Sequence, residues 1–174
     1  MQADAAVVSN ALSRESQRAR LTVSVKVVRE PSEDSPFAAW EMPITITGSS
    51  EAIRVRMAAT TRFIKVGTPA PSVDNETWTN ADWTNAGVVS IGEQNRSLRT
   101  DFSVSKNQAS QYAAGVLQGV LMVRVEYCDV FLRRHHVTAC ATRSVNPLPI
   151  GGVNYCGIVV DSNTSTDVDA ECRD

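Results

Sequence analysis

The stretch from Tyr127 to Cys140 concentrates the side chains of this chain that could do chemistry. It reads YCDVFLRRHHVTAC and holds both histidines, two of the four cysteines and two adjacent arginines. As a metal site it would offer a C-x6-H-H-x3-C spacing, with these candidate ligands: Cys128, His135, His136 and Cys140. Structural zinc sites take paired ligands two to four residues apart, and the chain has no C-x-x-C. The spacing therefore disfavours zinc.

The same stretch could hold a Cys128–His135 nucleophile and base, but no glycine-framed nucleophile surrounds Cys128. The sequence also lacks G-x-S-x-G, P-loop, G-x-G-x-x-G and H-E-x-x-H motifs. We therefore expect no enzyme, no catalytic residue, no metal site and no cofactor. No D-x-D-x-D-G pattern marks a calcium loop, although a calcium ion bridging subunits would leave no local signature.

A structural interpretation fits the periodicity of this stretch better. Val123, Val125 and Tyr127 alternate with polar residues, as in a strand, and the chain is expected to turn at or near residues 133–136. The turn would present a basic patch at the rim of a sheet, made of Arg133, Arg134, His135 and His136. Such a patch could touch phosphate or an acidic neighbour, or simply be solvated.

The four cysteines, at positions 128, 140, 156 and 172, allow three pairings. The first twenty residues lack a positive segment followed by an apolar one, so they do not read as a secretory signal. We therefore expect a chain made in a reducing cytosol with buried free thiols, in which a disulfide becomes feasible only outside the cell.

Elsewhere the pattern predicts strands with little helix. Leu21, Val23, Val25 and Val27 alternate with polar residues, and extended segments follow at 40–48, 52–66, 88–92, 96–104, 119–134, 136–144 and 153–161. The segment 52–66 is expected to break at its small residues, and 107–119 to form a short helix. Roughly eight strands separated by turns are typical of an all-β, antiparallel sandwich or barrel.

This pattern divides the chain into three parts. Residues 1–19 form an N-terminal arm or short helix, 20–161 a single β-sandwich domain, and 162–174 an acidic tail. Arg14, Arg18 and Arg20 would make a minimal basic arm for RNA, or an ordinary exposed helix face. Trp78 and Trp83 stand in matching contexts, TWTNA and DWTNA, and are either loop anchors or interface residues.

Composition narrows the class of protein. The chain has 174 residues, enough for one domain with a real core, and a net charge of −2, so its overall charge indicates neither nucleic acid nor membrane as a partner. No stretch approaches the roughly 20 apolar residues of a membrane span.

The organisation resembles that of coat proteins from very small icosahedral viruses, particularly satellite viruses. The resemblance covers residues 20–161, through strand count, loop style, the long strand GVLMVRVEYCDVFLRR and the closing GVNYCGIVVD. It implies a single-domain, eight-stranded jelly roll behind a short N-terminal segment. It also implies self-assembly into a homo-oligomeric shell of sixty copies around a single-stranded RNA genome, in a virion made in the host-cell cytoplasm.

The sequence departs from that family at its N-terminus. Family members carry a strongly basic arm, whereas the first twenty residues here hold three arginines against Asp4 and Glu15, a net charge of +1. The negative charge of the RNA would then be neutralised by Arg14, Arg18 and Arg20. Arg54 and Arg56 would contribute if their side of the sheet faces the interior of the shell. The alternative function is a non-enzymatic β-sandwich that binds or adheres as a monomer.

Overall fold

The chain folds into two antiparallel β-sheets. The computed structural model describes residues 17–71, 78, 81–91, 93, 96–145, 152–160 and 172–173. The first sheet contains β1 (Leu21–Val23), β2 (Lys26–Arg29), β3 (Phe37–Ile46) and β6 (Arg96–Ser103). The second contains, in spatial order, β5 (Thr84–Val89), β4 (Ala52–Lys65), β7 (Leu117–Cys128), β8 (Arg134–Arg143) and β9 (Asn154–Val160). The all-β, two-sheet sandwich is thereby confirmed.

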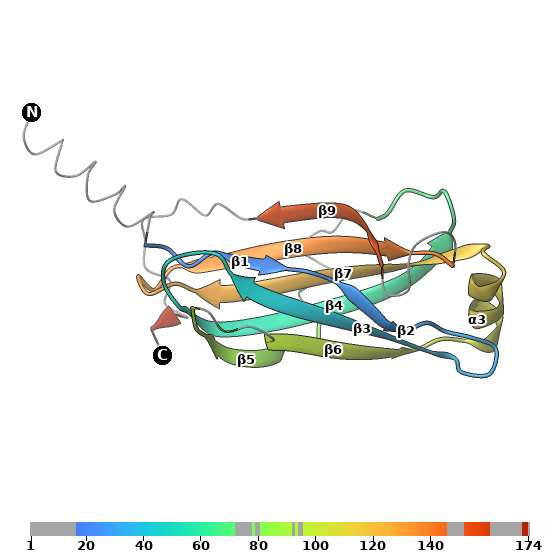
Figure 1. Ribbon diagram of the computed structural model, residues 1–174, viewed down its shortest axis with the longest axis horizontal. Coiled ribbons are helices and arrows are strands. Elements are labelled where there is room, and N and C mark those ends of the chain that lie inside the picture. The colour runs from blue at the N-terminus through green and yellow to red at the C-terminus, as the bar shows by residue number, and fades with distance from the viewer. Residues whose placement is uncertain are drawn as a thin grey trace, which may run out of the picture.

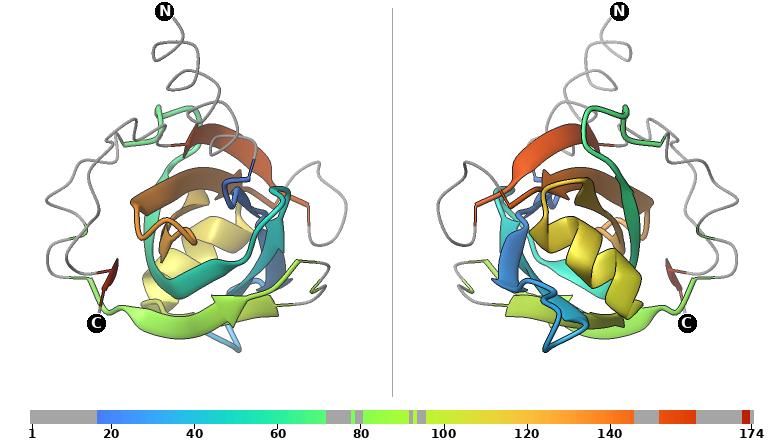
Figure 2. Two further views of the ribbon diagram at one scale, coloured as in Figure 1. Left: turned by 90° about the vertical axis from the view of Figure 1, so that its left-hand side faces the viewer. Right: turned by 90° about the vertical axis from the view of Figure 1, so that its right-hand side faces the viewer.

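In the first sheet, β3 is the central strand. It pairs with β6 over its length and with β1 and β2 in succession, so that β1 and β2 act as one interrupted strand. In the five-stranded sheet, β7, β8 and β9 follow one another as a meander. The predicted jelly-roll connectivity is not confirmed by this order, because two Greek keys would interleave strands distant in sequence. Figure 2 shows the sheets curving around a shared interior.

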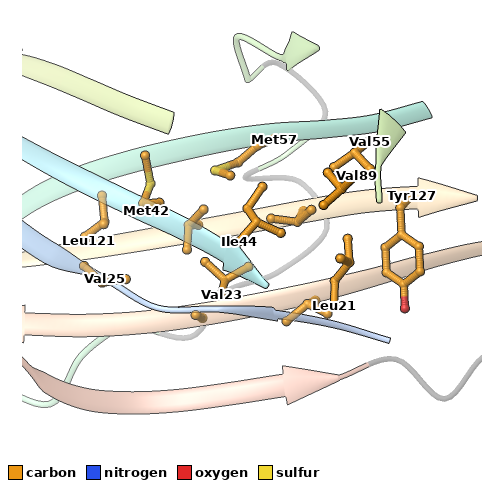
Figure 3. Close-up of a cluster of buried hydrophobic side chains, with 14 of the residues drawn as sticks. Leu21, Val23, Val25, Met42, Ile44, Val55, Met57, Val89, Leu121 and Tyr127 are labelled. Carbon is orange, nitrogen blue, oxygen red and sulfur yellow. The ribbon is translucent and has the colours of Figure 1, made fainter. Parts of the chain in front are cut away.

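The core lies between the two sheets and follows the predicted alternation. Leu21, Val23, Val25 and Val27 are all buried, as expected. They pack with residues of the opposite sheet such as Leu121 of β7, labelled in Figure 3. Val123 and Val125 of β7 belong to the same buried cluster. Each of these fully buried aliphatic side chains contributes roughly 1.5–3 kcal/mol of apolar burial.

Strand β7 is apolar on both of its faces. Val120 and Met122 point away from the other sheet and form a second cluster with Ala58, Cys140 and the indole of Trp78. Trp78 therefore covers part of the outer face of the five-stranded sheet, which we define as the face turned away from the other sheet. This cover explains why β4 continues through its small residues instead of breaking: Ala58 and Ala59 lie in an unbroken β4–β7 register.

A short helix covers one end of the sandwich (Figure 1). It is α3 (Lys106–Ala113), it begins with a capping box between Ser105 and Gln108, and Gly115 follows it at φ +72°, which glycine adopts without strain. Tyr112 packs edge-to-face on Phe63 at 5.8 Å. Burial is the main reason that the pKa of Tyr112 rises to about 12. The predicted short helix is confirmed, in the first half of its range.

All four cysteines are paired, so the prediction of free thiols is wrong. Cys128 bonds to Cys172 and Cys140 bonds to Cys156. The second bond joins neighbouring strands β8 and β9, a pairing that the register of the meander allows and the sequence alone does not define. The predicted N-terminal arm or helix and the predicted acidic tail fall mostly outside the described residues, as does Arg14.

Candidate functional site

The basic residues 133–136 do not form the turn that the sequence predicts there. The chain turns earlier, between Asp129 and Arg133, and β8 begins at Arg134. The Asp129 carboxylate accepts hydrogen bonds from the N–H groups of Phe131 (2.9 Å) and Arg133 (3.0 Å), which closes the turn directly after β7. Sequence analysis missed this turn because an apolar run, Val130 to Leu132, continues the strand-like pattern through it.

Successive residues of a strand point to opposite faces, so the side chains of the predicted patch that lie in β8 do not share one face. His135 points inward and is 1% exposed, whereas Arg134 and His136 belong to the outer face and His136 lies opposite Glu126. The expectation that His135 belongs to a solvated basic patch is therefore wrong. Its Nε2 lies 2.9 Å from Asp129 Oδ2 and its Nδ1 lies 2.7 Å from an Arg18 guanidinium nitrogen.

These two contacts define the tautomer of His135. A guanidinium only donates hydrogen bonds, so Nδ1 must accept, and the proton of a neutral ring sits on Nε2, where it is donated to Asp129. Burial acts to raise the pKa of the Asp129 carboxyl, but the hydrogen bonds from His135, Arg133 and Phe131 outweigh it, and the pKa is lowered. Arg18 is half-buried and holds this contact to His135, and its RNA contact stays a prediction.

The outer face of the five-stranded sheet brings the other predicted arginines together. Strand β4 contains a β-bulge, seen as a register shift against both β5 and β7 between residues 52 and 56. The extra residue keeps Ala52, Val55 and Met57 in the core and leaves both Arg54 and Arg56 outside it. Arg54 takes φ +51°, a left-handed conformation that costs about 1–2 kcal/mol for a residue with a side chain.

Beside this bulge is a pocket of about 320 Å³. Its lining comes from four adjacent strands and consists of Arg54, Arg56, Asn85, Gly87, Glu126, Tyr127, Cys128 and Arg134. Arg134 from the predicted patch therefore joins Arg54 and Arg56 from the predicted RNA-binding pair. Sequence analysis named these three arginines but placed them in two separate groups.

Glu126 is the acidic residue of this lining. Its Oε2 accepts two hydrogen bonds from Arg56, at 3.0 and 2.7 Å, and its Oε1 forms an ion pair with Arg124 at 3.0 Å. The Arg56 guanidinium also lies 4.7 Å from the ring centroid of Trp83, a cation–π contact. The sequence did not single out Arg124, Glu126 and Asn85 as site residues. The alternating charges in VRVEYC were the available signal for the first two. That signal could not be used, because the sequence does not show which strand pairs with this segment.

The two predicted interface tryptophans differ in exposure. Trp78 is 4% exposed and packs in the outer cluster, so it is a loop anchor, and the predicted interface role is wrong for it. Trp83 is half-buried between that cluster and Arg56. Arg20 is exposed, and its RNA contact stays a prediction.

The disulfides bear on both chemical roles considered for the cysteines, the zinc site and the Cys128–His135 nucleophile and base. A disulfide sulfur is neither a zinc ligand nor a nucleophile, so neither the zinc site nor the Cys128–His135 pair exists in this state. Among the described residues, no three metal-ligating side chains gather at one point. The described part of the chain contains no helix with the length and hydrophobicity to span a membrane.

No protein-family model matches this chain, and no curated protein is similar to it in sequence.

Proposed function

We propose that this chain is a structural subunit that assembles with copies of itself, as the coat protein of a small icosahedral virus does. The observation that carries the proposal is the exposure of large apolar side chains on the edge strands of the five-stranded sheet. Ile158 on β9 is 55% exposed and Val88 on β5 is 45% exposed. Monomeric proteins usually protect such edges with charge, proline or a covering segment.

The proposal extends to the shell that the subunits form, the RNA inside it and the compartment in which the disulfides form. Two facing antiparallel sheets are the architecture from which jelly-roll shells are built, and we propose a homo-oligomeric particle, sixty copies in its simplest form. Arg20, Arg54, Arg56 and Arg134 would meet the phosphates of a single-stranded RNA genome. Disulfides are rare in a reducing cytosol, so subunits made in the host cytoplasm would oxidise after the virion leaves the cell.

A second candidate function is a β-sandwich binding module. The pocket beside Arg54 favours it, because a concave site with convergent polar side chains is complete within one chain. This candidate requires no assembly, and the two proposals therefore differ in the mass of the purified protein.

The edge strands provide the test. Ile158→Lys and Val88→Lys place a charge on β9 and β5, and we expect each to shift the protein from a large particle toward small species in sedimentation velocity. Val116→Lys is the matched control, because Val116 is 48% exposed but lies in the segment between α3 and β7. Equal assembly of all three variants and the wild type would contradict edge-mediated association.

A further inference from the structure

We propose that the pocket beside the β4 bulge is a binding site for a phosphoryl anion, with Arg54, Arg56 and Arg134 as its hydrogen-bond donors. The inference rests on the proposed function only where the anion belongs to a nucleic acid backbone. A free phosphate has the same chemistry, and the experiment below separates the two sources.

Backbone strain is the first argument. Arg54 adopts a left-handed backbone that glycine would adopt without penalty, at a bulge that interrupts the pairing of β4 with both neighbouring strands. Strained non-glycine residues at bulges gather where a side chain must be aimed at a ligand. The bulge places the Arg54 side chain in the same pocket as that of Arg56, two residues further along the strand.

Charge is the second argument. Three arginines and one glutamate line the pocket, so the lining carries two more positive than negative charges. The two oxygens of Glu126 are already engaged by Arg56 and Arg124. Arg54 and Arg134 also have contacts within the chain, so an incoming anion would exchange with part of those contacts.

The shape of the site is the third argument. The pocket's 320 Å³ lies at the small end of ligand pockets and suits a phosphate with an attached sugar. The β5 wall contributes Asn85 and a glycine, Gly87, whose φ of +76° a residue with a side chain would adopt only under strain. Arginine's planar fork matches the oxygens of phosphate in a bidentate way that lysine does not.

Trp83 offers a direct reporter for the test. Its ring lies under the Arg56 guanidinium, so an anion that accepts a hydrogen bond from Arg56 should change the fluorescence of the indole. Inorganic phosphate and a single-stranded RNA of about ten nucleotides would each be titrated into the full chain, with RNA binding also followed by anisotropy at several salt concentrations. A Trp83→Phe variant assigns the fluorescence signal to this ring.

Arg54→Gln and Arg134→Gln should each weaken phosphate and RNA binding about ten-fold, because each removes a charge-assisted hydrogen-bond donor. Each should also make the negative slope of log K against log salt for RNA shallower by about 0.7, the value for one phosphate contact on a single strand. Arg62→Gln is the control, since Arg62 lies exposed at the far end of the same strand. Circular dichroism checks that every variant is folded.

The possible results separate the sources of the anion. Binding of both probes, lost in the Arg54 and Arg134 variants alone, supports the site and its use for RNA. Phosphate binding without RNA binding supports the site with a small phosphorylated ligand and counts against the genome contact. RNA binding that the pocket variants leave unchanged, or no binding of either probe, overturns the inference. None of these results depends on whether the chain assembles.

Arg54→Gly supplies a second, independent variant. It relieves the left-handed strain at position 54, so it should raise the urea midpoint of unfolding while it weakens phosphate binding as Arg54→Gln does. A variant that is both more stable and unchanged in binding would show that the strained arginine serves no ligand at this pocket.

Discussion

At the scale of single residues, the buried carboxylate of Asp129 accepts three hydrogen bonds. Its carboxylate closes the β7–β8 turn by accepting hydrogen bonds from two backbone N–H groups, and it accepts a third from Nε2 of the buried His135 ring. His135 in turn accepts from Arg18, and the Tyr127 hydroxyl donates to the Ala19 carbonyl at 3.2 Å. These contacts attach the segment before β1 to the end of the second sheet, over a sequence separation of more than 100 residues.

Asp129→Asn should destabilise the protein by about 2 kcal/mol at pH 7, because an amide nitrogen or oxygen would face a donor arrangement built for a carboxylate. The folded-state pKa of Asp129 is lowered, so its contribution is complete above the unfolded value near 4 and is lost as pH falls through the folded value. The gap between wild type and variant, measured by urea unfolding, should therefore narrow below about pH 4.

Asp101→Asn is the control for this measurement. Asp101 forms an exposed ion pair with Arg99 at 3.2 Å, and such pairs contribute about 0–1 kcal/mol. An Asp129→Asn variant as stable as this control, or a gap that stays constant down to pH 3, would contradict the role given to the buried carboxylate.

The residue types of the candidate site could be predicted, but their grouping could not. Arg54 and Arg56 were recognisable as the polar side of a strand. Their meeting with Arg134 and Glu126 depends on the β4–β7–β8 register and on a bulge, and both are set by long-range pairing. His135 was misplaced for a related reason, since a shift of the turn by a few residues decides which side chains of β8 face inward.

At the scale of elements, strands with one buried face were predictable and strands with two were less so. The alternation from Leu21 to Val27 matches β1 and β2 because one face is solvent-exposed. Strand β7 is buried on both faces by the core and by the loop bearing Trp78, so its sequence shows an apolar run with no clear end. Its end at Cys128 is set by the Asp129 turn.

The disulfides should stabilise two different elements. Replacing Cys140 and Cys156 with serine removes a bond that closes 16 residues, which corresponds to about 3 kcal/mol in the chain-entropy model. We expect a loss of that size in urea unfolding and faster amide exchange in β9, because β9 pairs with β8 alone.

The pair Cys128 and Cys172 is the comparison. It closes 44 residues, so its replacement should cost about 4 kcal/mol and leave amide exchange in β9 unchanged. A loss below 1 kcal/mol for both double variants, or equal exchange in β9 in both, would show that the bonds do not act on these elements as described.

At the scale of the whole molecule, side-chain contacts hold the two sheets together at both ends of the sandwich. Arg143 pairs with Glu30 at 2.5 Å near α3, and the contacts of Arg18, His135 and Asp129 close the opposite end (Figure 1). Exposed apolar side chains remain on the edge strands β5 and β9. Exposed apolar side chains on edge strands suit repeated self-association, and we propose that copies of this chain assemble through them.

The mass of the purified wild-type protein, measured by size exclusion with light scattering, tests that claim most directly. We predict a particle in the megadalton range, about sixty times the 18.8 kDa chain, and a high 260/280 nm absorbance ratio on the same peak if RNA is packaged. A protein-like ratio on that peak would retain assembly and reject packaging. A species no larger than a dimer across a range of pH, salt and calcium would contradict self-assembly and favour the binding module.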